Sequence, residues 1–467
     1  MSNNASQRLL LALVLIILLV FYCFLSTKAS FEFREIQDLM NYDMLAEALL
    51  SGQLHLKVEM DPDRANSPDP SNPGLPYDGL ADAIIFQGKY YLLQQPLPAV
   101  FHAMWIALTG YSLPTGVGVT ISAVGCLLLL GLILWKIRES FFLESPVWIL
   151  WFIWLSFALS AAQLYMISRP IIYHETISFG VMFVLLGTLL FTYALTGTRH
   201  QTVLFALSGI FFGAGGACKA NLFLYPLSFL ACWFVGSVTA ARELKSLVSR
   251  AFFFLSPSII FVVLLLIYNY LRFGAFLDFG RRYSLVSNVE FYEYCCLKGH
   301  FFRIGHVVHQ LYNYLLALPD IHYGARFISI NFGGIQVSTF GDLLIARQDL
   351  VSVFLMIPIL ILVLLIPFLP GSNSQSKVFG LIIACCIISS LITFGLLTSY
   401  VWASTRFVYE FTPLLFIVVY CVLASLWERI RVNKRLRQLA IAGIVLLFCA
   451  NTLMGLKAGI VGFMYVR

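Results

Sequence analysis

The feature that most constrains this chain is a series of apolar runs, each about twenty residues long. A helix of about 20 apolar residues crosses about 30 Å of hydrocarbon, and a helix satisfies its own backbone hydrogen bonds where no water is present. The sequence therefore predicts an all-α polytopic membrane protein with about 11 transmembrane helices. The predicted spans are 9–26, 115–136, 146–167, 176–195, 202–217, 221–240, 252–271, 350–369, 378–399, 407–427 and 438–463.

Composition supports lipid as the main solvent of this chain. Of its 467 residues, 60% are hydrophobic and 11% are charged, whereas soluble domains carry about 25% charged residues. The formal net charge of +7 could suggest nucleic acid as a partner, but the basic residues form short clusters beside the apolar runs. Such clusters orient membrane proteins, so we expect membrane lipid as a partner and no nucleic acid.

The cysteines do not indicate a metal site. Eight of the ten lie inside apolar runs, where they behave as small hydrophobic residues. The other two, Cys295 and Cys296, are adjacent in a polar stretch, and adjacent cysteines rarely bridge each other. The sequence has no CxxC pair, so it predicts neither a disulfide framework nor a thiolate metal site.

The first apolar run follows Arg8 and ends near Leu25. A cleaved signal peptide is the alternative to a first span. The run is long for a signal peptide, however, and no small-x-small cleavage site follows it cleanly. A retained first span is therefore expected.

The distribution of charge predicts how the spans are oriented. The segment 27–95 carries eleven acidic and five basic residues, which gives it a net charge of −6. Loops expected on the other face carry Lys and Arg at 136–138, 242–250 and 429–437. Because cytoplasmic loops are enriched in Lys and Arg, eleven spans with a cytoplasmic N-terminus fit this pattern. A twelfth candidate, Ala99–Leu108, is too short to cross and is expected to be an interfacial helix.

Two long segments on the predicted outer face, 27–114 and 272–349, hold most of the ordered polar sequence, so we expect the protein to act on that face. The spacing of apolar residues over Ile36–Leu50 predicts an amphipathic helix lying on the membrane. Asp38 and Tyr42 would share one face of this helix. Asp38 is then either a general base toward an acceptor or a first-turn carboxylate that the helix dipole favours.

Further polar residues are expected at the outer ends of spans. Arg169, His174 and Glu175 follow the third span, where such side chains are costly unless they are used or paired. They are either functional or an interfacial anchor with a helix cap. Lys219 follows a glycine-rich run at 213–216 that favours close helix packing, and a lone Lys at membrane depth is a functional candidate. The sequence contains no Walker or GxGxxG nucleotide motif.

Four arginines, Arg272, Arg281, Arg282 and Arg406, also fall on the predicted outer face. Positive-inside statistics disfavour basic residues there, so a specific role is expected. Guanidinium groups can bind phosphate through two hydrogen bonds at once. The alternative is ion pairing with Asp278 and with the acidic first loop.

These residues belong to motifs that together resemble the GT-C superfamily of membrane glycosyltransferases. The similarity is to the branch of protein O-mannosyltransferases and the lipid A aminoarabinose transferase, and it extends over about 30–415. The matching motifs are Asp38-x-x-x-Tyr42 followed by Leu45-Ala46-x-x-Leu49-x-x-Gly52, Gly88-Lys89-Tyr90-Tyr91 with Gln95-Pro96-Leu97-Pro98, Tyr173-His174-Glu175, Tyr268-Asn269-Tyr270-x-Arg272-Phe273-Gly274 with Phe279-Gly280, and Arg406-Phe407-x-x-Glu410-Phe411-x-Pro413.

The resemblance implies a glycosyltransferase that moves a sugar from a polyprenyl-phosphate carrier to an acceptor, by inverting direct displacement at the anomeric carbon. Asp38 would be the catalytic base. Leu39 follows it where many relatives carry Glu, which leaves Glu35 or Asp43 as alternative acids and leaves a divalent cation undecided as cofactor. The residues implied to hold the carrier phosphate are Arg272, Arg281, Arg282, Arg406 and Lys219. The residues implied to shape the substrate pocket are Tyr42, Tyr91, His174 and Glu175.

The expected architecture is a GT-C-like transmembrane catalytic domain over 1–435 and a C-terminal transmembrane helix over 436–467. The expected location is a bacterial inner or cell membrane, with the active face extracytoplasmic. The acceptor stays open between glycolipid, polysaccharide and protein. The alternative function is a transporter or flippase of a lipid-linked or anionic substrate. Transporters often contain internal repeats with paired broken helices, and this sequence shows no matching halves.

Overall fold

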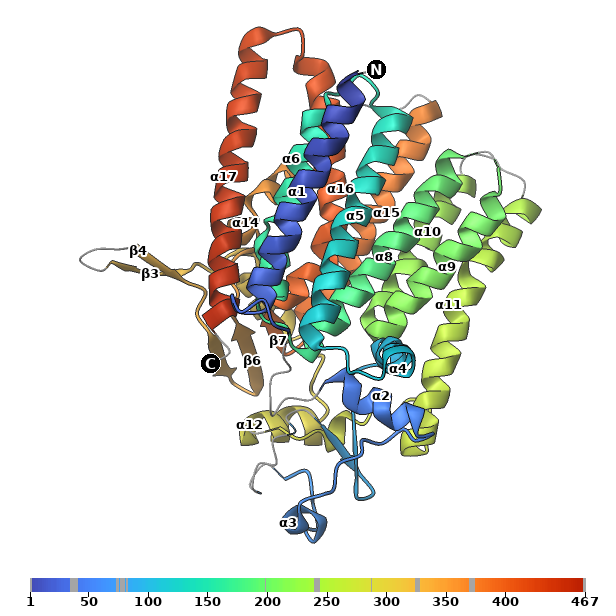
Figure 1. Ribbon diagram of the computed structural model, residues 1–467, viewed down its shortest axis with the longest axis vertical. Helices are drawn as coiled ribbons and strands as arrows, with labels where there is room; N and C mark the ends of the chain where they lie inside the picture. Colours follow the sequence, from blue (N-terminus) through green and yellow to red (C-terminus); the bar gives the residue numbers. More distant parts are fainter. Residues whose placement is uncertain are drawn as a thin grey trace.

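The computed structural model describes residues 2–33, 41–72, 75, 80, 83–197, 199–238, 244–286, 288–323, 328–368 and 374–464. Long helices run side by side, and short helices and strands gather at one end of them (Figure 1). The long helices are α1 (Ser2–Ser26), α5 (Thr115–Phe141), α8 (Ile172–Thr196), α9 (Gln201–Cys218), α10 (Leu224–Val238), α11 (Leu244–Phe273), α15 (Ser374–Ser399), α16 (Thr405–Ile430) and α17 (Lys434–Met464).

Within these described ranges, nine helices are long and apolar enough to cross a membrane, and one bent pair makes a tenth candidate. The predicted all-α polytopic membrane protein is therefore confirmed. The bent pair consists of α6 (Val147–Ala158) and α7 (Ala161–Ser168), which meet at an angle of 41°. Together they replace the straight third span that the sequence predicts over 146–167.

The break between α6 and α7 is stabilised by side chains from two other spans. Ser160 caps the start of α7, where its Oγ accepts from the backbone N–H of Gln163 at 3.3 Å. The Tyr22 hydroxyl donates to the Ala158 carbonyl oxygen at 2.8 Å, and Asn451 Nδ2 donates to the Ser156 carbonyl oxygen at 2.8 Å. Backbone groups freed inside a membrane must find such partners, so these contacts make the break tolerable.

The predicted span 350–369 differs from expectation in its helix type. It forms a short helix, α14 (Val353–Met356), and a 3-10 helix, η4 (Pro358–Phe368). Eleven residues of 3-10 helix at about 2.0 Å each extend about 22 Å, so this segment covers much of the hydrocarbon thickness. The two termini lie at opposite ends of the bundle (Figure 1), which agrees with an odd number of crossings.

The polar segments 27–114 and 272–349 fold into short elements at one end, here called the outer end. These elements are α2 (Tyr42–Leu50), α3 (Pro62–Ala65), β1 (Ile84–Phe86), β2 (Lys89–Tyr91), α4 (Leu97–Thr109), η2 (Arg281–Tyr283), α12 (Val289–Phe291), η3 (Tyr292–Leu297), α13 (His306–Leu315), β3 (Asp320–Tyr323), β4 (Ile328–Asn331), β5 (Ile335–Phe340) and β6 (Leu343–Gln348). The expected short helix over 99–108 is α4, and it lies across the ends of the long helices (Figure 1). The expected amphipathic helix begins at Tyr42 as α2, whereas 34–40 lie outside the described residues.

The strands at the outer end form small sheets that connect distant parts of the chain. β1 pairs with β2, and β3 pairs with β4, both antiparallel. β5 pairs antiparallel with β6, and β6 pairs in parallel with β7 (Trp402–Ser404). Because β7 immediately precedes α16, this pairing fixes the start of α16 against the second outer segment.

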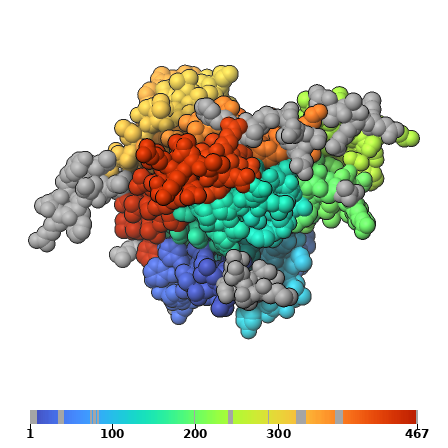
Figure 2. All heavy atoms as spheres, turned by 90° about the horizontal axis from the view of Figure 1, so that it is seen from above, coloured from blue at the N-terminus to red at the C-terminus, as the bar shows by residue number. Residues whose placement is uncertain are grey.

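The basic clusters gather at the opposite end. Arg431, between α16 and α17, forms an ion pair with Glu144, between α5 and α6. The view onto this end shows the red C-terminal helices directly beside the teal α5–α6 region (Figure 2). Acidic outer elements and basic connections therefore occupy opposite ends of one bundle.

Close packing of α9 uses its glycines, as the glycine-rich run predicts. A Cβ at Gly209 would lie 1.9 Å from the Phe254 carbonyl oxygen of α11. A Cβ at Gly213 would lie 2.9 Å from Ser258 Cα, and one at Gly215 would lie 3.0 Å from the Gly180 carbonyl oxygen of α8. Small residues let helix backbones approach in membranes, where lipid tails provide no hydrophobic driving force for association.

Substitution of Gly209 tests this packing. Gly209→Ala gains helix propensity of about 1 kcal/mol, but its methyl group overlaps a backbone oxygen, so we expect net destabilisation of about 1–3 kcal/mol. Gly380→Ala on α15 is the matched control, because a Cβ there meets nothing within 4 Å. Thermal unfolding of the two purified variants, followed by tryptophan fluorescence, measures the difference. Equal midpoints would contradict the close contact.

Candidate functional site

The first turn of α8 is where polar side chains from several elements meet. Four consecutive residues, Tyr173 to Thr176, lie in this turn, and at 3.6 residues per turn they point in four directions. Their contacts are Tyr173 with Arg406, His174 with Tyr165, Glu175 with His102, and Thr176 with Tyr42. This turn therefore joins the spanning bundle to the outer elements.

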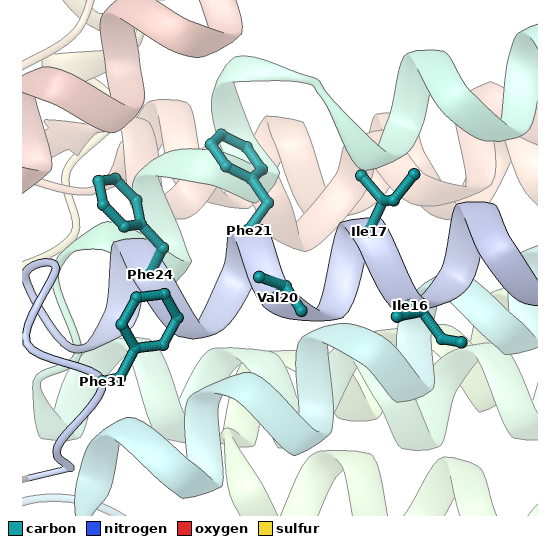
Figure 3. Close-up of a pocket in the computed structure, with 6 residues that line it drawn as sticks. All are labelled: Ile16, Ile17, Val20, Phe21, Phe24 and Phe31. Atoms are coloured by element: carbon teal, nitrogen blue, oxygen red, sulfur yellow. The ribbon is translucent and has the colours of Figure 1, made fainter.

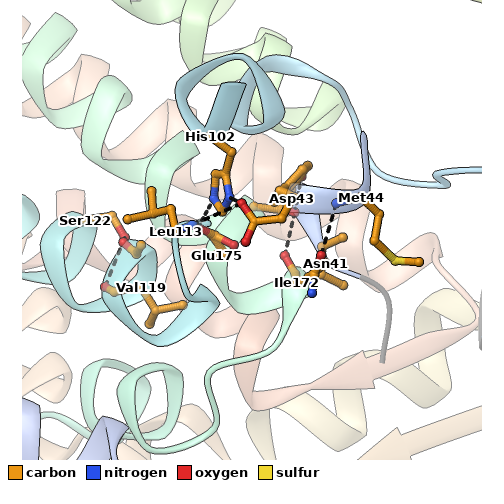
Figure 4. Close-up of polar contacts among 12 residues, drawn as sticks. Asn41, Asp43, Met44, His102, Leu113, Val119, Ser122, Ile172 and Glu175 are labelled. Atoms are coloured by element: carbon orange, nitrogen blue, oxygen red, sulfur yellow. Dashed lines mark hydrogen bonds and ion pairs between the residues drawn. The ribbon is translucent and has the colours of Figure 1, made fainter. Parts of the chain in front are cut away.

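Asp43, His102 and Glu175 form a buried triad across three elements. His102 on α4 places Nδ1 2.8 Å from Asp43 Oδ1 of α2 and Nε2 2.8 Å from Glu175 Oε1 of α8 (Figure 4). Both ring nitrogens face a carboxylate oxygen, so both donate, and the ring carries a proton on each. Burial lowers the pKa of His102, but hydrogen bonds and charges from Asp43 and Glu175 outweigh it and raise the pKa to about 9.

Neighbouring backbone groups complete the surroundings of the triad. The Leu113 backbone N–H donates to Asp43 Oδ1 at 3.2 Å, and Asn41 caps α2 by accepting from the Met44 N–H at 3.2 Å. A Cβ at Gly118 of α5 would lie 1.8 Å from Glu175 Oε1, so only glycine leaves room for this carboxylate. The triad is thus enclosed by α2, α4, α5 and α8.

The triad does not fit a divalent cation. A histidine ligand must offer an unprotonated nitrogen to the metal, and both nitrogens of His102 face carboxylates instead. Among the residues that the structure describes, no group of three or more His, Cys, Asp or Glu side chains is arranged to hold a metal ion.

Four basic side chains gather beside the triad and are here called the cationic cluster. Its members are Arg169, Lys219, Arg281 and Arg406. The Arg406 guanidinium lies 4.6 Å from the Tyr173 ring centroid, and Lys219 Nζ lies 4.5 Å from that of Phe407. The charges of Arg281 and Arg406 act on Lys219, and those of Arg169 and Arg406 act on Asp349. Three of the five predicted phosphate-binding residues are thus brought together.

Two buried carboxylates balance part of this charge. Lys219 forms an ion pair with Glu410, to which Asn221 Nδ2 also donates. Arg169 Nη1 lies 3.7 Å from Asp349 Oδ2, and the Tyr165 hydroxyl donates to the same oxygen at 2.8 Å. Burial raises the pKa of Asp349, although Tyr165, Arg169 and Arg406 act in the opposite direction.

The cationic cluster carries a net positive charge that reaches the surface. Four cations face two carboxylates, so a formal charge of +2 remains when all are ionised. Lys219 is 21% exposed and Arg169 is 16% exposed, whereas Glu410 and Asp349 are 0% and 1% exposed. Because the counter-ions are buried and the cations reach the surface, this end of the bundle favours an anionic ligand.

The other predicted residues make different contacts. Buried Arg272 donates to the Leu92 carbonyl oxygen at 3.0 Å and to Asn269 Oδ1 at 2.8 Å, so it fixes the end of α11. Arg282 is 63% exposed and pairs with Asp278 at 3.0 Å. Tyr91 is buried and packs edge-on against Phe273, with ring centroids 5.6 Å apart. The proposed base Asp38 and its alternative Glu35 lie outside the described residues.

Two of the residues predicted to shape the substrate pocket, Tyr42 and His174, are buried around the start of α8. The Tyr42 hydroxyl lies 2.6 Å from Thr176 Oγ1, and His174 Nδ1 lies 3.1 Å from the Met166 carbonyl oxygen. These contacts hold α2 and α7 against α8. Glu175, the third candidate at this turn, belongs to the triad.

Sequence reasoning missed His102 and Asp349. His102 is the one titratable side chain in the otherwise apolar stretch Leu97–Thr109, which is the signal that could have singled it out. Asp349 directly precedes the apolar run at 350–369, so it reads as an ordinary loop acid. Its partners Arg169 and Tyr165 lie far away in sequence, and only the fold brings them together.

Two hollows lie near this end of the bundle. A groove of about 380 Å³ on α1 is entirely apolar, and its lining side chains are drawn in Figure 3. Its lining residues are Ile16, Ile17, Val20, Phe21, Phe24 and Phe31. A second hollow of about 370 Å³ reaches Asp349, with Asp320, Phe332 and Met464 also on its wall. Only the second touches a charged group of the site.

The fold is similar to that of an oligosaccharyltransferase from Archaeoglobus fulgidus. Its apo crystal structure matches with a TM-score of 0.50 and 13% sequence identity, over 97% of this chain and 56% of that chain. Another structure, the same organism's oligosaccharyltransferase AglB in complex with an inhibitory peptide and a dolichol-phosphate, has a TM-score of 0.49 and 13% identity, over 96% of this chain and 55% of that chain. This chain thus spans about half the length of the matched proteins.

At 13% identity this likeness concerns the fold alone, and a shared fold does not establish a shared activity. No protein-family model and no curated protein matches the sequence.

The ion pair of Lys219 and Glu410 predicts an asymmetric response to mutation. Lys219→Met leaves a fully buried carboxylate without its cation, which costs on the order of 3 kcal/mol. Glu410→Gln leaves a partly exposed ammonium group that water can solvate, so we expect a smaller loss. The double variant should be more stable than Lys219→Met alone. Thermal unfolding midpoints of the three variants test this order, and a reversed order would contradict it.

Proposed function

We infer that this protein is a GT-C glycosyltransferase that moves a sugar from a polyprenyl-phosphate carrier to an acceptor at the extracytoplasmic face of the membrane. The observation that carries the proposal is the cationic cluster, whose counter-ions are buried while its cations reach the surface. It lies at the end of a membrane bundle whose fold resembles that of an oligosaccharyltransferase. A lipid-linked phosphate is the anion that such a location suits.

The proposed reaction is a displacement at C1 of the sugar. The acceptor hydroxyl or amine attacks C1, and the bond between C1 and the carrier phosphate oxygen breaks with its electron pair leaving on the phosphate. The acceptor proton passes to a carboxylate base. The departing polyprenyl phosphate gains one negative charge, which preorganised cations stabilise most strongly in the transition state.

The residues divide between these tasks. Arg281, Arg406 and Lys219 are proposed to hold the carrier phosphate, because they share the cationic cluster. Asp38 stays our proposed base. Its alternative Asp43 is buried and already accepts hydrogen bonds from His102 and from the Leu113 N–H, so it is poorly suited to take a proton from an acceptor.

The surroundings also suit a lipid-linked donor. Exposed apolar side chains along the spanning helices offer surface for a polyprenyl tail within the bilayer. A sugar activated on a lipid phosphate carries its own leaving group, so the outer face needs no nucleotide. We propose the orientation that places the N-terminus and the basic connections in the cytoplasm, because positive charge marks that side. The acceptor is a glycolipid, a polysaccharide or a protein.

Replacement of Asp38 by Asn tests the proposed base. In the native host, Asp38→Asn and a deletion strain should both accumulate the same polyprenyl-phosphate sugar, because the donor is made and no longer consumed. Mass spectrometry of lipid extracts measures this, with the amount of variant protein in the membrane as control. A change in the deletion strain alone would move the base from Asp38 to its alternative Glu35. No change in either strain would refute the transferase and favour transport.

Replacement of one arginine inside the cationic cluster and one outside it tests the proposed phosphate site. Arg406→Gln should lower kcat/KM for the lipid-linked donor about 10-fold to 100-fold, the effect of losing one charged hydrogen bond. Arg282→Gln is the matched control, since that side chain is exposed and pairs with Asp278. Its kcat/KM should stay within about 2-fold of wild type, as exposed ion pairs contribute little. Equal losses in both variants would contradict the proposed phosphate site.

A further inference from the structure

The reaction proposed above does not use the triad of Asp43, His102 and Glu175, although burying three titratable side chains together is costly. The triad connects three segments that are distant in sequence: α2 of the first outer segment, α4, and the start of α8. Its two carboxylates and one protonated ring carry a formal charge of −1, whereas loss of the ring proton would leave −2 in a dry site. The contact is therefore strong only while His102 is protonated.

α4 places His102 between the bilayer and the site. The apolar side chains of Val100, Met104 and Leu108 repeat every four residues on one face of this helix and are exposed. The opposite face carries His102 and the small buried residues Ala99 and Ala103. A short helix with one exposed apolar face lies in the membrane interface, with its polar side away from lipid. His102 is the polar connection from that helix to α2 and α8.

We propose that the protonated ring of His102 docks the first outer segment onto the start of α8 and is thereby a positioning residue for the transfer reaction. The positioning role of His102 in the reaction rests on the proposed function, whereas its docking role does not. The first turn of α8 also carries Tyr173, which contacts Arg406 of the cationic cluster. Release of α2 and α4 would thus disturb the neighbourhood of the phosphate site.

The titratable groups around the ring determine the direction of the pH effect. Asp43 and Tyr42 face it from α2 and Glu175 faces it from α8, while Cys218 of α9 acts on Glu175. The pKa of His102 is raised from 6.5 to about 9 in the folded protein. A raised pKa means that the stabilisation is complete below pH 6.5 and is lost as the pH rises through about 9. Docking should weaken on the alkaline side.

Proteolysis of the full chain in lipid nanodiscs tests docking directly. Subtilisin cleavage within 42–113 is followed by mass spectrometry from about pH 7 to about pH 10, and each rate is divided by that of a peptide substrate at the same pH. The wild-type ratio should rise as the pH passes about 9. His102→Gln should cleave fast at every pH, because its amide oxygen must face one of the two carboxylates. His309→Gln, an outer-end histidine stacked on Phe340, is the matched control and should follow wild type.

A second variant keeps the test decisive if His102→Gln does not accumulate. Asp43→Asn removes one of the two carboxylates but leaves Glu175, so the pH at which cleavage rises should move downward. A flat wild-type ratio, or a midpoint that Asp43→Asn leaves unchanged, would overturn the docking role.

The rate of sugar transfer is the second measurement. Its donor is the lipid-linked sugar that accumulates in the deletion strain. The wild-type kcat should fall over the same alkaline range, and His102→Gln should lower kcat more than it raises KM and abolish that alkaline fall. Loss of kcat with an unchanged pH profile would show a merely structural residue and overturn the positioning role. Absence of transfer by wild type, with the cleavage pattern intact, would refute the proposed function and leave docking supported.

Discussion

The contacts made by the first turn of α8 are what the rest of the outer end depends on. Glu175 reaches His102 and Thr176 reaches Tyr42, so two outer helices are fixed to one span through two adjacent residues. Tyr173 on the same turn contacts Arg406, which lies in the first turn of α16. A one-residue change in where α8 starts would rotate every one of these side chains by about 100° and separate all the partners at once. The cap and turn geometry at Ile171 is therefore as important to the site as any charged side chain.

Charge burial explains how the same end can be both stable and positively charged. A buried ion is tolerated when a partner compensates it, and each buried carboxylate here has a basic partner: Glu410 with Lys219, Asp349 with Arg169, and Asp43 and Glu175 with His102. The difference between the two groups lies in exposure. The triad is closed from water, and its charges serve to hold helices together. In the cationic cluster only the carboxylates are closed off, so the unbalanced positive charge is available to a ligand.

The sequence predicted the membrane bundle well because hydrophobic length is a local property: a run of about 20 apolar residues crosses wherever it occurs. It did not predict the bend between α6 and α7 or the 3-10 form of η4, since both depend on partners elsewhere, such as Tyr22 and Asn451 for the bend. The same division holds for the site. Charged residues at span ends were visible as candidates. The sequence left open which of them pair with a nearby acid, as Arg282 does with Asp278, and which gather in the cluster, as Arg406 does. His102 stood out only as the one titratable side chain of an apolar segment, and its role depends on the two carboxylates that the fold places beside it.

The bend in the third span connects the far C-terminal helix to the site. A Cβ at Gly455 of α17 would lie 1.9 Å from the Leu159 carbonyl oxygen, and one at Gly462 would lie 2.1 Å from Ser168 Oγ. Glycines thus let α17 pack directly along α7, while Asn451 satisfies a carbonyl that the bend frees. With α7 redirected in this way, Tyr165 and the following Arg169 reach Asp349. The predicted C-terminal helix over 436–467 therefore supplies no residue to the cationic cluster. It stabilises the bend that brings Arg169 to Asp349, and so it supports the cluster indirectly.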